Sequence, residues 1–161
     1  VATAALANKG GVFRPYLVKQ IENAQTAEVK NINPERTRLI ELRPENIEFV
    51  KDAMIGVTKP GGTAARAGYS AQYEFAGKTG TAQVFSMKGG EYKEEEVAER
   101  LRDHALFIAF APAENPSIAI SVLVENGGHG SRTAAPIARK VLDFYLLGKG
   151  PKLKNRNRQD F

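Results

Sequence analysis

The sequence predicts an α+β fold in which helices pack on an antiparallel β-sheet. Segments with strand composition and segments with helical periodicity are segregated along the chain and do not alternate as β-α-β units. The most apolar strand segments, 106–111 and 117–125, are joined by the short link 112–116, which begins and ends with proline and is typical of an antiparallel hairpin. A helical pattern begins soon after this hairpin and would pack on the sheet.

The first forty residues predict one helix and short strands. Residues 1–8 are rich in alanine, and the two glycines that follow would end a helix there. Residues 12–21 have strand composition, in which Pro15 indicates a sheet edge or a break near the start. The segment 23–38 lacks a clear period and predicts a surface excursion, with a short return strand at 29–32.

The middle of the chain predicts a long helix over residues 44–57, with a proline in its first turn. Its apolar stripe consists of Ile47, Val50, Lys51, Met54 and Ile55. A Pro-Gly-Gly run stops this helix, and residues 63–68 predict one further helical turn, capped by Thr63 and ended by Gly68. A strand then covers residues 74–85.

The segment 86–103 is polar and predicts a long excursion from the sheet, with a helix over residues 94–102. Glu94, Glu95 and Glu96 are adjacent, so they fan around a helix and cannot form a paired-carboxylate site by themselves. We interpret them as a solvated face, on which the spacing of Glu96 and Arg100 fits an exposed ion pair.

The last helix follows the hairpin. Ser131 or Thr133 would cap it, and Gly148 would end it. The stripe expected to be buried consists of Ile137, Val141, Leu142, Tyr145 and Leu146. We therefore expect residues 1–147 to form the domain and residues 148–161 to form a basic, mobile tail.

Size and composition set the first limits on function. The chain has 161 residues, of which 42% are hydrophobic and 25% charged, and it is long enough to bury one core. Its formal net charge is +5, but five basic residues lie in the last thirteen positions, so the charge gives no reason to expect a nucleic-acid partner.

The sequence has no cysteine, which excludes disulfides and thiolate metal sites within it. No apolar run approaches the roughly twenty residues that cross a bilayer.

The strongest functional signal lies around Lys78. Small residues flank this lysine, and glycine inside a strand often marks the close approach of a ligand or of another backbone. Thr79 and Thr81 lie two residues apart and so share one face of a strand, while Lys78 projects from the other face unless Gly80 bends the strand. An ammonium group and two hydroxyls suit an anion such as a substrate carboxylate.

Other interpretations of these motifs are weaker. A Walker phosphate loop would need glycine where Gln72 stands and would open a helix, whereas strand-forming residues follow here. An incidental lysine on a surface hairpin is the simplest alternative. The segment 128–133 is only faintly similar to a dinucleotide-binding turn, since it lacks the third glycine. We expect His104 to make a structural hydrogen bond and His129 to be exposed, and we predict no metal or cofactor.

Four sequence motifs, together with the order of elements, resemble a known family. They are Ala-Gly-Lys-Thr-Gly-Thr-Ala-Gln-Val at 76–84, Glu-Arg-Leu-Arg-Asp-His-Ala at 99–105, Phe-Ala-Pro at 110–112 and Val-Glu-Asn-Gly-Gly at 124–128. On these residues the chain resembles the C-terminal part of the transpeptidase domain of class B penicillin-binding proteins, in particular the penicillin-binding protein 2 subfamily. Lys-Thr-Gly is a signature of such enzymes. The resemblance implies a partial penicillin-binding and β-lactamase-like fold.

The resemblance implies a role for each residue of the motif. Lys78 would supply positive charge for the substrate carboxylate and bias the proton relay, and the hydroxyls of Thr79 and Thr81 would hold that carboxylate. The backbone N–H of Thr81 would form the oxyanion hole together with the N–H of the nucleophile. Gly80 would let the acyl group lie against the strand, where a D-Ala-D-Ala stem peptide could add by strand pairing.

Two motifs that the resemblance requires do not occur in this sequence. None of the five serines is followed three residues later by lysine, and none is followed two residues later by asparagine. The Ser-x-x-Lys motif, which carries the nucleophile, and the Ser-x-Asn motif are therefore both missing. The chain also opens at Val1 within a helical pattern. We expect it to be part of a longer serine D,D-transpeptidase that works through an acyl-enzyme, and to be inactive alone.

For the intact protein the resemblance implies peptidoglycan cross-linking during rod-shape elongation. The implied partners are the peptidoglycan stem peptide ending in D-Ala-D-Ala, β-lactam antibiotics, a polytopic glycan polymerase and elongation scaffold proteins; no nucleic acid is expected. The implied location is the inner membrane, with a single membrane helix and the catalytic domain in the periplasm. A D,D-carboxypeptidase or β-lactamase-type hydrolase of the same fold, or a binding fragment without chemistry, are the alternatives.

Overall fold

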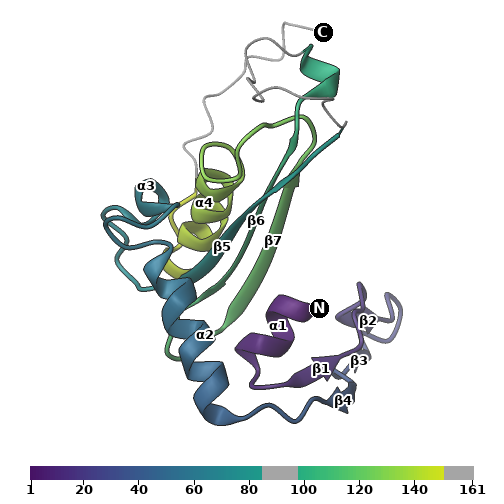
Figure 1. Cartoon of the computed structure of the whole chain (residues 1–161). Helices are drawn as coiled ribbons and strands as arrows, with labels where there is room; N and C mark the ends of the chain where they lie inside the picture. Colours follow the sequence, from purple (N-terminus) through teal and green to yellow (C-terminus); the bar gives the residue numbers. More distant parts are fainter. Residues whose placement is uncertain (85–97, 151–161) are drawn as a thin grey trace, which may run out of the picture.

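A three-stranded antiparallel sheet lies at the centre of the structure, a computed structural model that describes residues 1–84 and 98–150. The strand order is β5 (Ala76–Ala82), β6 (His104–Ala111) and β7 (Ile118–Val124) (Figure 1). Every residue of β5 has a partner in β6, and the β6–β7 hairpin is in regular register. Both the strand around Lys78 and the hairpin are thus confirmed. The helices are α1 (Ala2–Ala7), α2 (Pro44–Gly56), α3 (Ala65–Gly68) and α4 (Ala134–Leu147).

Helices cover both faces of this sheet. Alternate residues of a strand point to opposite faces, and the two core clusters follow this alternation. On one face Phe107 and its neighbours two residues away in β6 pack against α4. On the other face Ala76 and Phe110 pack against Met54 of α2, with side chains of α1 beside them. This arrangement confirms the predicted α+β class.

The helix α4 turns a different face to the sheet from the one that its apolar stripe predicts. Within that stripe Leu142 is fully buried, but three members are about half exposed: Ile137, Val141 and Tyr145. The residues that pack on the sheet are Ala134, Ala135, Ala138 and Leu142. Because small side chains let two elements approach closely, the alanine face fits against the sheet better than the bulkier face does. The prediction of the buried stripe is therefore confirmed for Leu142 and for Leu146, which packs against the same cluster, and wrong for the other three residues.

The helix α2 has the predicted ends, with Pro44 in its first turn. Its stripe is confirmed only in part: Ile47 and Met54 are buried, whereas Val50 is 41% exposed. Next to it, Phe49 is 77% exposed. One side of α2 therefore faces the sheet, and the other presents apolar side chains to the surface.

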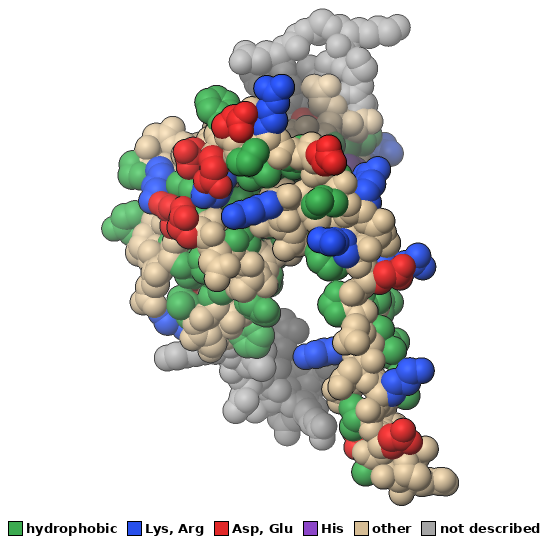
Figure 2. All heavy atoms as spheres, turned by 90° about the horizontal axis from the view of Figure 1, so that it is seen from below, with side chains coloured by type: hydrophobic (Ala, Val, Ile, Leu, Met, Phe, Trp, Pro, Cys, Tyr) green, Lys and Arg blue, Asp and Glu red, His purple; other side chains and the backbone are tan. Residues whose placement is uncertain are grey.

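Two short ribbons form an arm beside α1 (Figure 1). In one ribbon β1 (Gly11–Phe13) pairs with β4 (Arg36–Leu39), and in the other β2 (Gln20–Glu22) pairs with β3 (Val29–Asn31). The predicted strand at 12–21 is thus broken, as Pro15 allows, and the return strand is confirmed. The strand β4 was not predicted, because its sequence is polar and all four residues are exposed. Hydrophobic and charged side chains are mixed along this arm (Figure 2).

The predicted N-cap is confirmed in position for Thr133 and wrong for Thr63, and neither helix has a side-chain cap. The N-cap of α3 is Ala64 and not Thr63, and no side chain caps this helix. Thr133, one of the two predicted candidates, is the N-cap residue of α4, but its hydroxyl donates to the carbonyl oxygen of Gly127 at 2.7 Å and makes no hydrogen bond to the helix. The C-terminal prediction is confirmed, since Gly148 ends α4 with a φ of +65°.

Some predictions fall outside the described residues. These are most of the helix over 94–102, the Glu94–Glu96 face with its ion pair to Arg100, and the tail from residue 151. The described part of that region contains a 3-10 turn, η2 (Glu99–Leu101). Among the described residues, no helix has the length and apolarity that crossing a membrane requires.

Thr58 links the end of α2 to the start of β5, and we predict that Thr58→Val destabilises the chain by about 1–3 kcal/mol. The residue is 6% exposed, and its hydroxyl lies 2.9 Å from the carbonyl oxygen of Phe75, which loses this donor in the variant. The free energy of unfolding in urea measures the effect. The control is Thr37→Val, whose exposed hydroxyl lies 3.3 Å from Val12 O; an equal loss in both variants would contradict the prediction.

Candidate functional site

The strand that carries the Lys-Thr-Gly motif lies at an edge of the sheet. β5 pairs with β6 on one flank, and among the described residues no strand pairs with its other flank. In an edge strand every second backbone N–H and C=O points to the unpaired side, where an extended peptide can add. The structure therefore places the motif where a substrate could reach both its backbone and its side chains.

Lys78 is exposed on the face of the sheet that α1 and α2 share. It pairs across the ladder with Ile108, which packs in the same cluster as Met54. The ammonium group does not enter the apolar interior, since the side chain is exposed and Nζ donates to the carbonyl oxygen of Thr79 at 2.8 Å. This lysine therefore offers its charge at the surface beside the open edge.

The two threonines of the motif lie on the opposite face, as the sequence predicts for an unbent strand. Thr79 is half-buried opposite Phe107, and Thr81 is exposed opposite Ala105. Gly80 keeps regular register, so it does not bend the strand to bring Lys78 onto the face of the threonines. Lys78 therefore lies on one face of the edge strand, and the two threonines lie on the other.

Two glycines allow close packing around the motif. A Cβ on Gly77 would lie 2.5 Å from Cζ of Phe107, so the ring of this core residue occupies the space beside the strand. A Cβ on Gly130 would lie 2.5 Å from Gly80 O and 2.2 Å from Leu106 O. The turn before α4 thus lies directly on the backbone of β5 and β6, which holds the Lys-Thr-Gly segment in place from behind.

Arg139 of α4 fastens the residues that lead into β5. Its Nε donates to Asp143 Oδ1 at 2.8 Å, and the hydroxyl of Tyr73 donates to the same oxygen at 2.8 Å. The guanidinium also donates to three backbone carbonyl oxygens, those of Ala67 (2.7 Å), Tyr69 (3.2 Å) and Ser70 (3.4 Å). The part-buried guanidinium of Arg139 therefore fixes the path of the chain between α3 and β5.

The charge states of Tyr73 and Asp143 are consistent with the hydrogen bonds that they make. Burial by itself would raise the pKa of Asp143, but the hydrogen bonds from Arg139 and Tyr73 outweigh burial and hold that pKa below its usual value. Burial, and then the hydrogen bond to Asp143, raise the pKa of Tyr73. Tyr73 is therefore a neutral donor and Asp143 a charged acceptor at neutral pH.

Sequence reasoning missed Thr63 and Arg139 as parts of this region. The hydroxyls of Thr63 and Thr79 lie 3.4 Å apart, which brings a third alcohol to the motif. Thr63 has the composition of a cap, and Arg139 lies within a helical pattern with nothing to distinguish it from a solvated residue. Their partners are far away in the sequence, so no local signal could have identified them.

The histidines have the structural positions that we expected. His104 accepts a hydrogen bond at Nδ1 from the backbone N–H of Asn126, at 2.9 Å, and His129 is exposed. Within residues 1–84 and 98–150, no group of three His, Asp or Glu side chains lies close enough to hold a metal ion. The described part of the site offers hydroxyls, an ammonium and backbone groups, which suit recognition of a peptide carboxylate.

An antiparallel sheet whose edge strand presents Lys-Thr-Gly is the arrangement of serine acyltransferases that recognise penicillin. The model of the penicillin-binding protein transpeptidase domain matches residues 1–143 of the chain. The chain therefore belongs to the penicillin-binding protein transpeptidase domain family, as the resemblance implied.

Relatives of known name agree with this assignment. The peptidoglycan D,D-transpeptidase MrdA of Haemophilus influenzae is 39% identical over 163 residues, which cover 97% of this chain and 24% of the relative. MrdA of Escherichia coli K12 is 39% identical over 149 residues, which cover 91% of this chain and 23% of the relative. The chain thus spans about a quarter of the length of these curated relatives.

Solved structures share the fold. The crystal structure of Pseudomonas aeruginosa PBP2 in complex with WCK 5153 matches 98% of this chain and 31% of that chain, with 39% identity and a TM-score of 0.69. A ceftriaxone acyl-enzyme complex of penicillin-binding protein A from M. tuberculosis matches 89% and 30%, with 32% identity and a TM-score of 0.70. Helicobacter pylori PBP2 in complex with MreC matches 78% and 21%, with 26% identity and a TM-score of 0.53.

The lowered pKa of Asp143 predicts how stability depends on pH. Its carboxylate stabilises the fold above the unfolded-state pKa of about 4, and this contribution disappears as pH falls through the lower folded-state pKa. We expect Asp143→Asn to cost on the order of 1 kcal/mol at pH 7 and less toward pH 2, where the wild type loses the charge as well. Urea unfolding from pH 2 to 7 measures this, with Asp52→Asn, an exposed carboxylate of α2, as the control. A constant difference across that range would contradict it.

Proposed function

We propose that this chain forms one wall of the active site of a peptidoglycan D,D-transpeptidase. The observation that supports the proposal is the exposed Lys78 on the open edge of β5, with Thr79 and Thr81 beside it, in a chain of the transpeptidase family. The nucleophilic serine would come from another part of the longer protein, because no Ser-x-x-Lys motif occurs in these 161 residues.

In the proposed reaction, the serine hydroxyl attacks the carbonyl carbon of the penultimate D-alanine of a stem peptide. An ester forms, the peptide bond breaks, and the terminal D-alanine leaves with the proton that the serine gave up. The amine of a second stem peptide then attacks the ester, which forms the cross-linking amide and returns a proton to the serine. The net change is the exchange of one amide for another, so no cofactor is needed.

The residues of β5 would act on this substrate from one side. The peptide pairs with the open flank of β5, and Lys78 supplies positive charge for its carboxylate and to the proton relay. The hydroxyls of Thr79 and Thr81 hold the carboxylate, Gly80 leaves room for the acyl group, and the N–H of Thr81 donates to the oxyanion. A β-lactam would be attacked as a mimic of the D-Ala-D-Ala end, a view supported by the ceftriaxone acyl-enzyme of the M. tuberculosis relative.

The proposed cellular context is cell-wall growth during rod-shape elongation. The longer protein would lie in the inner membrane through one helix, with its catalytic domain in the periplasm. A scaffold protein and a polytopic glycan polymerase would be its partners, and the complex of the Helicobacter pylori relative with MreC supports the first of these.

Labelled penicillin tests the proposal directly. We expect a fluorescent penicillin to acylate the longer protein that contains this chain, and not the isolated 161 residues, because the latter have no Ser-x-x-Lys serine. Denaturing gels followed by mass spectrometry of the labelled peptide measure both results. Covalent labelling of a serine within this chain would overturn the assignment, as would an unlabelled longer protein that is folded.

Lys78→Ala in the longer protein tests the role of the motif. Removing the ammonium takes away the charge that holds the substrate carboxylate and biases the proton relay, so we expect the second-order rate constant of acylation to fall at least about 100-fold. The melting temperature should stay unchanged, because Lys78 is exposed. Lys30→Ala, on the exposed strand β3, is the matched control and should retain full acylation. Unchanged kinetics in Lys78→Ala would remove this residue from the mechanism.

A further inference from the structure

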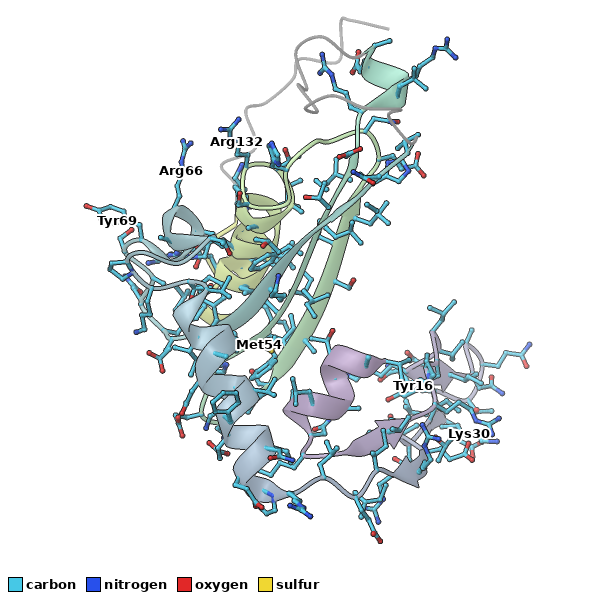
Figure 3. All side chains as sticks on the ribbon, in the orientation of Figure 1. Tyr16, Lys30, Met54, Arg66, Tyr69 and Arg132 are labelled. Carbon is cyan, nitrogen blue, oxygen red and sulfur yellow. The ribbon has the colours of Figure 1, made fainter. Side chains whose placement is uncertain are left out.

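A cationic cleft lies between α3, with the residues that follow it, and the start of α4. It has a volume of about 520 Å³. Figure 3 shows Arg66 and Arg132 extending from these two regions to the same side of the molecule. Its lining includes four cationic residues, Arg66, Arg132, Arg139 and Lys140, together with Tyr69 and Ser70.

Most of the positive charge in this cleft is not neutralised. Arg139 is committed to Asp143 and to backbone carbonyls, so it serves the structure. Arg66, Arg132 and Lys140 are exposed, and within the described ranges 1–84 and 98–150 none of them forms an ion pair with a carboxylate. Three cations held near one another without counter-charges favour the binding of an anion with more than one negative charge.

A second cavity, of about 610 Å³, adjoins the cationic cleft and is mostly apolar. The two share Arg66, Tyr69 and Ser70 as lining residues, and the second continues over Pro60 and Ala65. The cation in the second cavity besides Arg66 is Lys59, which pairs with Glu74. Tyr69 is 81% exposed and lines both cavities, so an apolar surface continues from the cationic cleft into the second cavity.

The backbone at Tyr69 and Ser70, which lines both cavities, is held by hydrogen bonds within the protein. The hydrogen bonds from Arg139 to the carbonyl oxygens of Ala67, Tyr69 and Ser70 hold the backbone on which Arg66 and Tyr69 stand. Ser70 has a φ of +53°, which bends the chain at this point. A preorganised wall reduces the entropy that binding would cost, because the backbone need not be ordered by the ligand.

We propose that these two cavities form one binding site for an anionic amphiphile, with its phosphate group in the cationic cleft and its apolar part over Tyr69, Pro60 and Ala65. Two guanidinium forks and an ammonium match the several acceptor oxygens of a phosphate better than a single carboxylate, which one fork would satisfy. The adjoining apolar cavity supplies the second requirement, since a free phosphate ion has nothing to place there. Its lining residues do not include Lys78, Thr79 or Thr81, so the site does not use the side chains of the proposed transpeptidase edge.

Three probes test the site on the full 161-residue chain, and the two amphiphiles among them are used below their critical micelle concentrations. The probes are dodecyl phosphate, inorganic phosphate and dodecyl maltoside, with binding followed by backbone amide shifts. We expect dodecyl phosphate to bind at least about tenfold more tightly than either other probe, because only it has both the charge and the chain. The shifts should concentrate at Ala67, Tyr69 and Ser70. If inorganic phosphate binds as tightly as dodecyl phosphate, the proposed role of the apolar chain is wrong. If dodecyl maltoside binds as tightly, the proposed role of the negative charge is wrong.

Substitutions separate the two halves of the site. Arg66→Ala and Arg132→Ala should each weaken dodecyl phosphate about tenfold and leave dodecyl maltoside unaffected. Tyr69→Ser should weaken dodecyl phosphate but not inorganic phosphate, since it removes apolar contact alone. The control is Arg38→Ala, an exposed arginine of β4 at the other end of the molecule. A loss in Arg38→Ala as large as in Arg66→Ala would mean that net charge, and not this cleft, is responsible.

Vesicles distinguish the source of the phosphate group. If the site takes a lipid headgroup from a membrane, the chain should sediment with vesicles that contain phosphatidylglycerol and not with vesicles of phosphatidylcholine alone. Arg66→Ala should reduce the fraction of the chain that sediments with the first kind of vesicle. Binding of dodecyl phosphate without binding to either vesicle would assign the site to a dispersed amphiphile. A glutamate-rich peptide that displaces dodecyl phosphate and binds more tightly would overturn the proposal in favour of an acidic protein partner.

Discussion

The structure depends on one constraint: β5 must be fixed although one of its flanks is unpaired among the described residues. Half the backbone groups of an edge strand lack a partner, so such a strand is usually the least restrained in its sheet. β6 restrains it along its whole length. The hydroxyl of Thr58 holds the carbonyl of Phe75 at its start, and Arg139 holds the chain before that point. The open edge is therefore rigid without being covered, as recognition of an extended peptide requires.

Close packing behind the strand serves the same end. Gly130 lies on the backbone of Gly80, and the ring of Phe107 fills the space beside Gly77, so larger residues at either glycine would push the strand outward. The alanine face of α4 allows this approach, because it brings the helix near enough for its preceding turn to touch β5. Small residues here set the position of the functional strand and only secondarily contribute buried area.

Arg139 links the two parts of the molecule to which we assign functions. Toward β5 its hydrogen bonds fix the residues that enter the strand, and toward the surface the same bonds hold the wall of the cationic cleft. The charge of Asp143 keeps this arginine in place, since the two part-buried groups form an ion pair. Loss of the pair would therefore disturb both regions together, whereas changes at the exposed Lys78 or Arg66 would affect one region each.

The sequence by itself determined the hairpin, the helix over Pro44–Gly56, the α+β class and the motif on β5, because composition, turn residues and periodicity act between near neighbours. Tertiary structure alone decided which face of α4 is buried, that β4 pairs with β1, and that the hydroxyl of Thr63 lies against Thr79 of β5 instead of capping α3. These outcomes depend on how closely two elements approach, and on partners far away in the chain. A local pattern records neither, so the motif could be recognised in the sequence while the arrangement that holds it could not.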